Sequence, residues 1–156
     1  MEVKKVGIAG FGFVGKATGH MVKLLGAEVV IYDKYQEQFN DIRVLSGCDF
    51  IFICVPTPCD GLVQDTSAID DFLDRYDAEV GEATVFVIRS TVLPGTTRDY
   101  DCKRGKHKYW FLCNPEFLTE RVHMHDAVNP VQIVIGSPRG PHGAGEIGRA
   151  SCRERV

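Results

Sequence analysis

Three closely spaced glycines open the first segment of the chain that could carry chemistry. A GxGxxG motif follows the short apolar run at 5–9 and precedes a helical apolar stripe; its residues are Gly10, Phe11, Gly12, Phe13, Val14 and Gly15. In such a motif the first glycine allows a tight turn, the second lets a ligand approach the backbone, and the third permits close packing of helix on strand. Free N–H groups and the dipole at the helix N-terminus attract a diphosphate. The segment therefore predicts a dinucleotide-binding loop.

An acidic residue follows the next strand-like segment. Asp33 comes directly after the run at 28–32 and lies eighteen residues beyond Gly15. A carboxylate at this place accepts hydrogen bonds from the ribose hydroxyls of an adenosine, and it repels a 2′-phosphate. The pattern favours NAD over NADP, although the neighbouring Lys34 weakens that preference. The glycine loop alone would also suit a flavin or an adenylate.

The apolar patterning of the chain predicts strands that alternate with helices. We expect strands at 5–9, 28–32, 49–55, 84–90, 109–113 and 131–136, and helices over 13–25, about 67–80 and a short stretch from 96 or 97. Runs that are nearly all apolar are typical of parallel strands covered on both faces. The alternation predicts an α/β fold with a Rossmann-type, doubly wound, mostly parallel sheet of six strands.

Composition narrows the class of protein. The chain has 156 residues, 44% of them hydrophobic, and a net charge of −3. The length predicts one domain, and the hydrophobic content excludes a disordered chain. The acidic balance argues against nucleic-acid partners, and no apolar run approaches the ~20 residues of a membrane span. The six cysteines lack CxxC spacing, which indicates reduced thiols, a cytoplasmic protein and no metal site.

The carboxyl-terminal part of the chain differs from the rest. We expect the domain to span residues 1–137 and the Gly/Pro-rich residues 138–145 to form a linker-like segment. Residues 146–156 resemble a translated sequencing adapter, so we expect a non-native tail there. A natural basic tail is the alternative.

Three further strand ends carry unusual segments. They read Val55-Pro56-Thr57-Pro58, Ser90-Thr91-Val92-Leu93-Pro94-Gly95 and Asn114-Pro115-Glu116-Phe117-Leu118-Thr119-Glu120. In open α/β sheets, ligands bind in the crevice at the carboxyl ends of the strands. Glu116 could act there as a base, because removing a hydroxyl proton while a hydride leaves requires one. The alternative is that Glu116 only caps the next helix.

With the glycine loop, these segments resemble the UDP-glucose/GDP-mannose dehydrogenase family, most closely its UDP-glucose 6-dehydrogenases. The resemblance covers about residues 4–136. It implies an NAD-dependent oxidoreductase of nucleotide-sugar metabolism, which oxidises the 6-hydroxyl of UDP-glucose, or of a related nucleotide sugar, through an aldehyde to the carboxylate.

The resemblance also implies a role for each segment. Residues 10–15 hold the diphosphate, Asp33 holds the ribose, and the nicotinamide side is lined by Val55, Pro56, Thr57, Pro58, Ser90, Thr91 and Val92. The substrate-facing loop consists of Glu116, Phe117, Leu118, Thr119 and Glu120. In it, Glu116 exchanges a proton through water beside Thr91, and Glu120 contacts cofactor or sugar. Arg89 departs from the family, in which lysine is common before the Ser-Thr pair.

The family's nucleophilic cysteine lies downstream in a Gly-rich motif, and none of the six cysteines here lies in such a motif. We therefore expect a truncated, inactive fragment of a parent enzyme that is homo-oligomeric through a missing downstream region. One alternative is a β-hydroxyacid-type NAD dehydrogenase domain, which would need a different glycine-rich signature after the fourth strand. Another is a non-enzymatic NAD-sensing module, which has no use for Thr91 together with Glu116.

Overall fold

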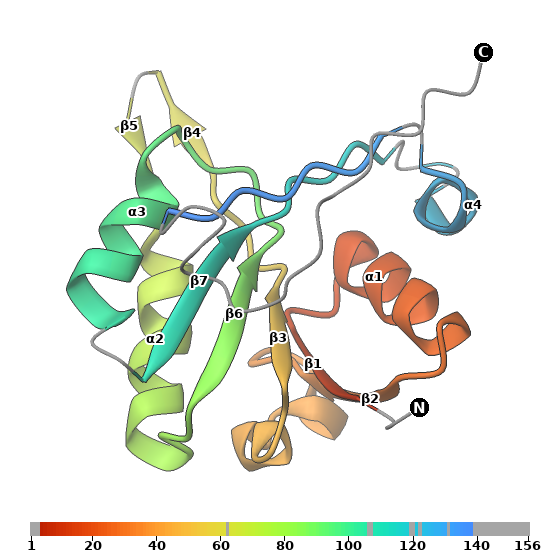
Figure 1. Cartoon of the computed structure of the whole chain (residues 1–156), viewed down its shortest axis with the longest axis horizontal. Helices are drawn as coiled ribbons and strands as arrows, with labels where there is room; N and C mark the ends of the chain where they lie inside the picture. Colours follow the sequence, from red (N-terminus) through yellow and green to blue (C-terminus); the bar gives the residue numbers. More distant parts are fainter. Residues whose placement is uncertain are drawn as a thin grey trace.

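A parallel five-stranded sheet forms the centre of the molecule (Figure 1). The computed structural model describes residues 4–61, 63–105, 108–118, 121, 123–130 and 132–138. The strands of the sheet are β1 (Lys5–Ala9), β2 (Glu28–Tyr32), β3 (Phe50–Ile53), β6 (Thr84–Ile88) and β7 (Tyr109–Cys113), in the order β2-β1-β3-β6-β7. Since all pairs are parallel, the five carboxyl ends lie along one edge. The parallel order, with its reversal beside β1, confirms the predicted α/β, doubly wound class.

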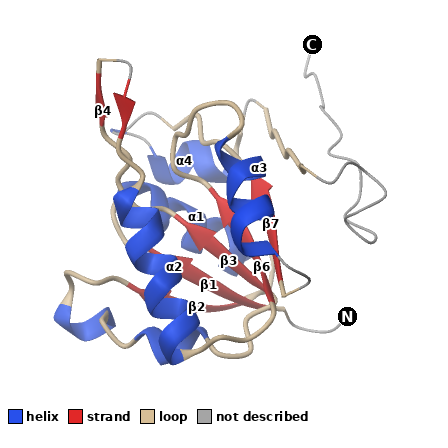
Figure 2. Ribbon diagram, turned by 90° about the vertical axis from the view of Figure 1, so that its left-hand side faces the viewer, coloured by secondary structure: helices blue, strands red, loops and turns tan. Residues whose placement is uncertain are grey.

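Helices cover both faces of the sheet (Figure 2). The helix α1 (Phe13–Leu24) lies on one face, and α2 (Ser67–Glu79) and α3 (Thr96–Tyr100) lie on the other. Shorter elements are η1 (Glu37–Phe39), η2 (Ile42–Leu45), the hairpin strands β4 (Cys59–Asp60) and β5 (Val63–Gln64), the π-helical turn η3 (Asp101–Gly105) and α4 (His123–Val128). The connection that follows β1 runs over one face of the sheet, and the connection that follows β2 runs over the other. A crevice therefore opens between them, beyond the carboxyl end of β1.

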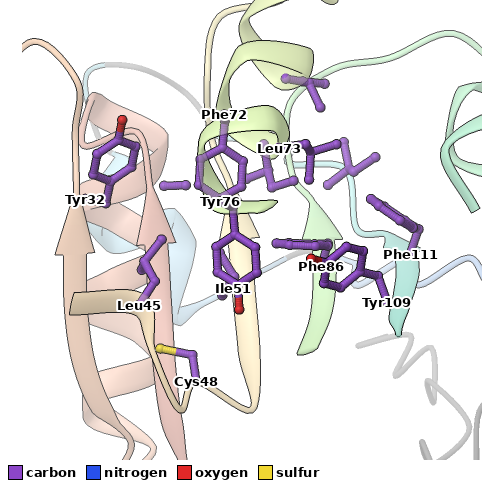
Figure 3. Close-up of a cluster of buried hydrophobic side chains, with 14 of the residues drawn as sticks. Tyr32, Leu45, Cys48, Ile51, Phe72, Leu73, Tyr76, Phe86, Tyr109 and Phe111 are labelled. Atoms are coloured by element: carbon purple, nitrogen blue, oxygen red, sulfur yellow. The ribbon is translucent and has the colours of Figure 1, made fainter. Parts of the chain in front are cut away.

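The larger core lies between the sheet and α2 (Figure 3). The α2 side chains Phe72 and Tyr76 recur at helical spacing and pack on Phe86 of β6, with ring centroids 6.0 and 5.1 Å away. Phe86 in turn contacts Tyr109 and Phe111 of β7 at 5.1 and 5.3 Å. Such aromatic pairs add to the stabilisation from buried area. The core therefore fixes β6 and β7, whose ends carry the polar segments, relative to the rest of the sheet.

The prediction of a sixth strand over 131–136 is wrong. Residue 131 lies outside the described residues, and 132–135 form no strand; only Gly136 makes an antiparallel bridge, to Cys113. The side chains of Ile133, Val134 and Ile135 are 47%, 40% and 43% exposed. This segment meets β7 only at its last residue, so its apolar run is not buried on two faces as an inner parallel strand would be.

The structure describes the chain only as far as residue 138. Residues 139–156, which include nearly all of the expected linker and the whole expected tail, lie outside the described residues. In the part of the chain that the structure covers, none of the helices combines the length and the hydropathy needed to cross a bilayer. The same part holds no group of three His, Cys, Asp or Glu side chains suited to a metal ion.

Candidate dinucleotide site

The first residues after the five strands are brought together at one edge of the sheet. In spatial order they are Asp33, Gly10, Cys54, Arg89 and Asn114. Backbone hydrogen bonds tie adjacent ends together: the N–H of Gly10 donates to the carbonyl of Tyr32 at 2.9 Å, and the N–H of Cys54 donates to that of Ala9 at 2.7 Å. The hydrogen bonds of the sheet thus fix the residues from which the site's loops begin.

Two glycines of the loop are required by its own packing. Gly10 has φ +90°, and a Cβ there would lie 2.7 Å from the carbonyl oxygen of Cys54. A Cβ on Gly15 would lie 1.9 Å from the carbonyl oxygen of Gly10. Both clashes are with backbone, which cannot move aside as a flexible side chain can. These positions therefore confirm the turn and the close helix packing that the spacing predicts.

Gly12 is different, because nothing lies within 4 Å of the Cβ that could be built on it. It stands at the N-cap of α1, whose first turn carries no acidic side chain. No side chain caps this helix start, so the free N–H groups of its first turn can donate to an anion. No atom of the protein would clash with a Cβ at this position. The glycine therefore points to an external ligand that needs the space.

Asp33 is held in place by the glycine loop. Its Oδ2 accepts a hydrogen bond of 2.7 Å from the N–H of Phe11 and one of 3.0 Å from the side chain of Gln36, while Oδ1 accepts one of 2.9 Å from the N–H of Tyr35. Burial raises the pKa of Asp33, but these hydrogen bonds together outweigh it and leave the pKa below its ordinary value. Asp33 is thus an oriented carboxylate at the place predicted for the ribose.

A cavity of about 620 Å³ extends from the glycine loop across the strand ends. The predicted site residues that line it are Gly10, Gly12, Phe13, Val14, Asp33, Val55, Pro56, Thr57, Ser90, Thr91, Glu116 and Leu118. A smaller cavity of about 350 Å³ shares Gly10, Asp33, Tyr35, Val55 and Pro56 with it and continues toward the start of α2. The glycine loop, the Asp33 carboxylate and Glu116 therefore line one continuous region.

Some predicted residues lie elsewhere. Pro58, Val92 and Phe117 line neither cavity; Val92 packs on the large core, and Phe117 is 54% exposed. Phe11 contributes its backbone to Asp33, while its ring packs on Phe39 with centroids 5.2 Å apart. The predicted Thr119 and Glu120 lie outside the described residues.

The loops after β3 and β6 are joined by hydrogen bonds. The Ser90 hydroxyl donates to the carbonyl of Val55 at 2.6 Å, so this serine connects the two loops. The carbonyl of Thr91 accepts from the Thr57 hydroxyl at 2.6 Å and from the amide of Gln64 at 2.8 Å. Thr91 is exposed and lines the cavity. Gln64, in β5, was missed by the sequence reasoning because nothing near it marks a motif.

A buried polar cluster lies at the ends of β6 and β7. Arg89 forms an ion pair with Glu116 and donates a hydrogen bond to the side chain of Asn114. Asn114 in turn donates to the carbonyl of Val134 at 2.7 Å. Arg89 is 6% exposed, and its burial lowers its pKa. The charge directly after the apolar strand was the available signal for Arg89, which sequence reasoning noted only as a departure.

A glycine loop at a helix N-terminus, a carboxylate at the end of β2 and a continuous cavity between them define a Rossmann-type dinucleotide-binding domain. The model of the UDP-glucose/GDP-mannose dehydrogenase family, NAD binding domain, matches residues 39–146. The chain belongs to this family. A second model, the NAD binding domain of D-isomer specific 2-hydroxyacid dehydrogenases, matches residues 1–62. Both matches describe NAD-binding domains, which agrees with the predicted cofactor.

Individual proteins show the same relationship. A UDP-glucose 6-dehydrogenase of Rickettsia conorii is 36% identical over 96 residues, which is 59% of this chain and 22% of that protein. The structure of a GDP-mannose dehydrogenase of Pseudomonas aeruginosa, solved as a ternary complex, matches with a TM-score of 0.67 at 25% identity and covers 85% of this chain and 40% of that one. A 3-hydroxyisobutyrate dehydrogenase of Mycobacterium tuberculosis shares the fold, with a TM-score of 0.68 at 15% identity, over 86% of this chain and 47% of that one. The chain thus spans less than half of the length of each.

Proposed function

We propose that this chain provides the NAD half of the active site in a nucleotide-sugar 6-dehydrogenase, acting on UDP-glucose or a related nucleotide sugar. The observation that carries the proposal is that Glu116 and the glycine loop line the same cavity. A cofactor held at Gly12 and Asp33 would extend along this cavity toward Glu116. A module that only senses NAD would have no need of a largely buried carboxylate in this cavity.

The residues of the loop fit NAD. The open space at Gly12 admits the diphosphate, and the N–H groups at the start of α1 would donate to it. Asp33 would accept hydrogen bonds from the adenosine ribose, with the adenine in the smaller cavity beside Tyr35. The nicotinamide would then lie in the larger cavity near Thr57 and Thr91.

The chain's own residues would remove the proton that the sugar hydroxyl loses during the oxidation. NAD, when bound, supplies the hydride acceptor for the oxidation of an alcohol. Glu116 would take the proton of the sugar hydroxyl through a water molecule, which Thr91 of the same cavity would hold. Arg89 pairs with Glu116 as a carboxylate, which is the form able to accept a proton. Leu118, at the cavity wall, would face the sugar.

A β-hydroxyacid dehydrogenase is the second candidate, favoured by the shared fold and by the model that matches residues 1–62. The segment that begins at Asn114 and the match over residues 39–146 favour the nucleotide sugar. The proposal further includes a cytoplasmic enzyme of polysaccharide biosynthesis that forms homo-oligomers.

The cofactor assignment is tested by calorimetric titration of the chain with NAD and NADP. NAD should bind more tightly, and Asp33→Ala should cost about 1–3 kcal/mol of NAD affinity through the loss of charged hydrogen bonds. Equal or tighter binding of NADP by the unmodified chain would overturn the assignment of Asp33. The matched control is Asp74→Asn, which removes a carboxylate from the exposed side of α2 outside both cavities.

A further inference from the structure

An ion pair joins two residues that line the smaller cavity, next to the Asp33 carboxylate. Lys34 follows Asp33 directly, and its Nζ lies 3.0 Å from Oδ2 of Asp71 on α2. Asp33, Lys34 and Asp71 all line this cavity, together with Ser67 and Ala68 from the first turn of α2. The pair therefore joins the end of β2 to the helix on the far side of the candidate adenosine pocket.

The position of Lys34 gives this pair its significance. A cation next to the end of the second strand is what a dinucleotide site uses to accommodate a 2′-phosphate. By sequence, then, Lys34 opposes the preference for NAD that Asp33 indicates. In the structure its ammonium is already engaged, by Asp71 and by the ring face of Tyr35, whose centroid is 5.7 Å away.

Stability does not account for this arrangement. The side chains of Lys34 and Asp71 are 39% and 44% exposed. Exposed pairs of this kind contribute little to folding, since solvent screens them and ordering two side chains costs entropy. Such a pair can nevertheless decide between two ligands that differ by a charged group at the same place.

We propose that Asp71 is a specificity-determining residue that disfavours NADP by holding Lys34 away from the 2′-phosphate. The neutral 2′-hydroxyl of NAD needs no cationic partner, so NAD binds without Lys34. A 2′-phosphate would meet the carboxylate of Asp33 and would find its natural counter-charge neutralised by Asp71. The inference rests on the proposed placement of the adenosine ribose at Asp33.

The quantity to measure is the ratio of the Kd for NADP to the Kd for NAD, from competition with bound NADH followed by fluorescence. Asp71→Asn should lower this ratio about fivefold at low ionic strength, because it releases Lys34 toward the phosphate. High salt should diminish the effect, since the interaction lies in solvent. The matched control is Asp74→Asn, which makes the same charge change on α2 outside the cavity and pairs with Arg104 instead.

A second background separates the role of Lys34 from simple repulsion by Asp71. In chains that carry Lys34→Gln, adding Asp71→Asn should change the ratio less than about twofold, because no ammonium is left to release. An equal decrease in both backgrounds, or no decrease with Lys34 present, would overturn the inference. If Asp33→Ala leaves NAD binding unaltered, the proposed ribose site itself fails, and this result is distinct from an unchanged ratio in Asp71→Asn.

Discussion

The guanidinium of Arg89 and the carboxylate of Glu116 form an ion pair where β6 and β7 end, on the wall of the candidate active-site cavity. The two side chains are 6% and 14% exposed. At this degree of burial each charge depends on the other, because removing one partner leaves a largely desolvated charge without its counter-charge. Arg89 is therefore expected to stabilise the fold, and it also lies beside Glu116, the candidate base.

Replacing Arg89 with methionine should destabilise the fold. Arg89→Met leaves the Glu116 carboxylate buried without its counter-charge, which costs about 3 kcal/mol. The free energy of unfolding, obtained from urea denaturation followed by circular dichroism, measures this cost. The second change Glu116→Gln, made in the same chain, should recover part of it, since a neutral amide needs no cation. Wild-type stability for Arg89→Met would show that the pair does not form in solution.

Substitution of Gly12 should separate binding from folding. Gly12→Val places a side chain in the open space where the diphosphate is expected, so NAD affinity should fall at least about a hundredfold. Because nothing in the protein occupies that space, the free energy of unfolding should change by less than about 1 kcal/mol. Calorimetric titration and urea denaturation of the same preparation measure the two effects.

Gly15 provides the opposite case within the same motif. A Cβ there would lie 1.9 Å from the carbonyl oxygen of Gly10, so Gly15→Ala should cost more than about 2 kcal/mol of stability. If Gly12→Val binds NAD normally while remaining folded, the glycine loop is not the diphosphate site. If both variants are equally destabilised, the distinction between a ligand glycine and a packing glycine is wrong.

Local sequence patterns predicted the five strands and the two long helices, because the apolar residues of each recur at the spacing that a strand or helix requires to face the core. They failed at Ile133, Val134 and Ile135, where an equally apolar run lies exposed. Whether such a run becomes a strand depends on a neighbouring strand with free hydrogen-bonding groups along its length. That neighbour is a tertiary feature, which periodicity does not contain.

The candidate site divides in the same way. Gly10, Gly12 and Asp33 were predictable because their spacing reflects one strand-turn-helix unit and the strand after it. The pairs Lys34–Asp71 and Arg89–Glu116 join residues 37 and 27 positions apart, through different elements. Each partner alone resembles an ordinary surface charge or helix cap. Only the sheet order brings the partners of each pair together, so local sequence could not predict these two contacts.

The pH dependence of stability should report the hydrogen bonds at Asp33. The pKa of Asp33 in the folded chain lies below its ordinary value of 3.8, so its ionised form stabilises the fold. This contribution is complete above the unfolded pKa and is lost as the pH falls through the lower, folded value. The difference in unfolding free energy between the wild type and Asp33→Asn should therefore shrink as the pH falls below about 4. A difference that grows on acidification would contradict the lowered pKa.

The chain alone should give no sustained NADH formation from NAD and UDP-glucose. The proposed oxidation passes through an aldehyde that a cysteine thiolate would hold, and thiolates form only where the pKa is low. Burial raises the pKa of Cys48 to about 11 and that of Cys54 to about 12, so neither ionises near neutral pH. Cys59 and Cys102 are exposed but lie outside the cavity that holds Glu116.

Two measurements check this expectation. Reaction with a thiol reagent in the native chain should label the exposed Cys59 and Cys102 rapidly and should leave the buried Cys48 unreacted until urea is added. The half-buried Cys54 should react slowly, because its pKa is raised. Absorbance at the NADH band should stay flat when NAD and UDP-glucose are added together, although calorimetry detects NAD binding to the same sample. Sustained NADH formation that Glu116→Gln abolishes would contradict this expectation, and would show that the chain carries out at least the oxidation of the alcohol to the aldehyde.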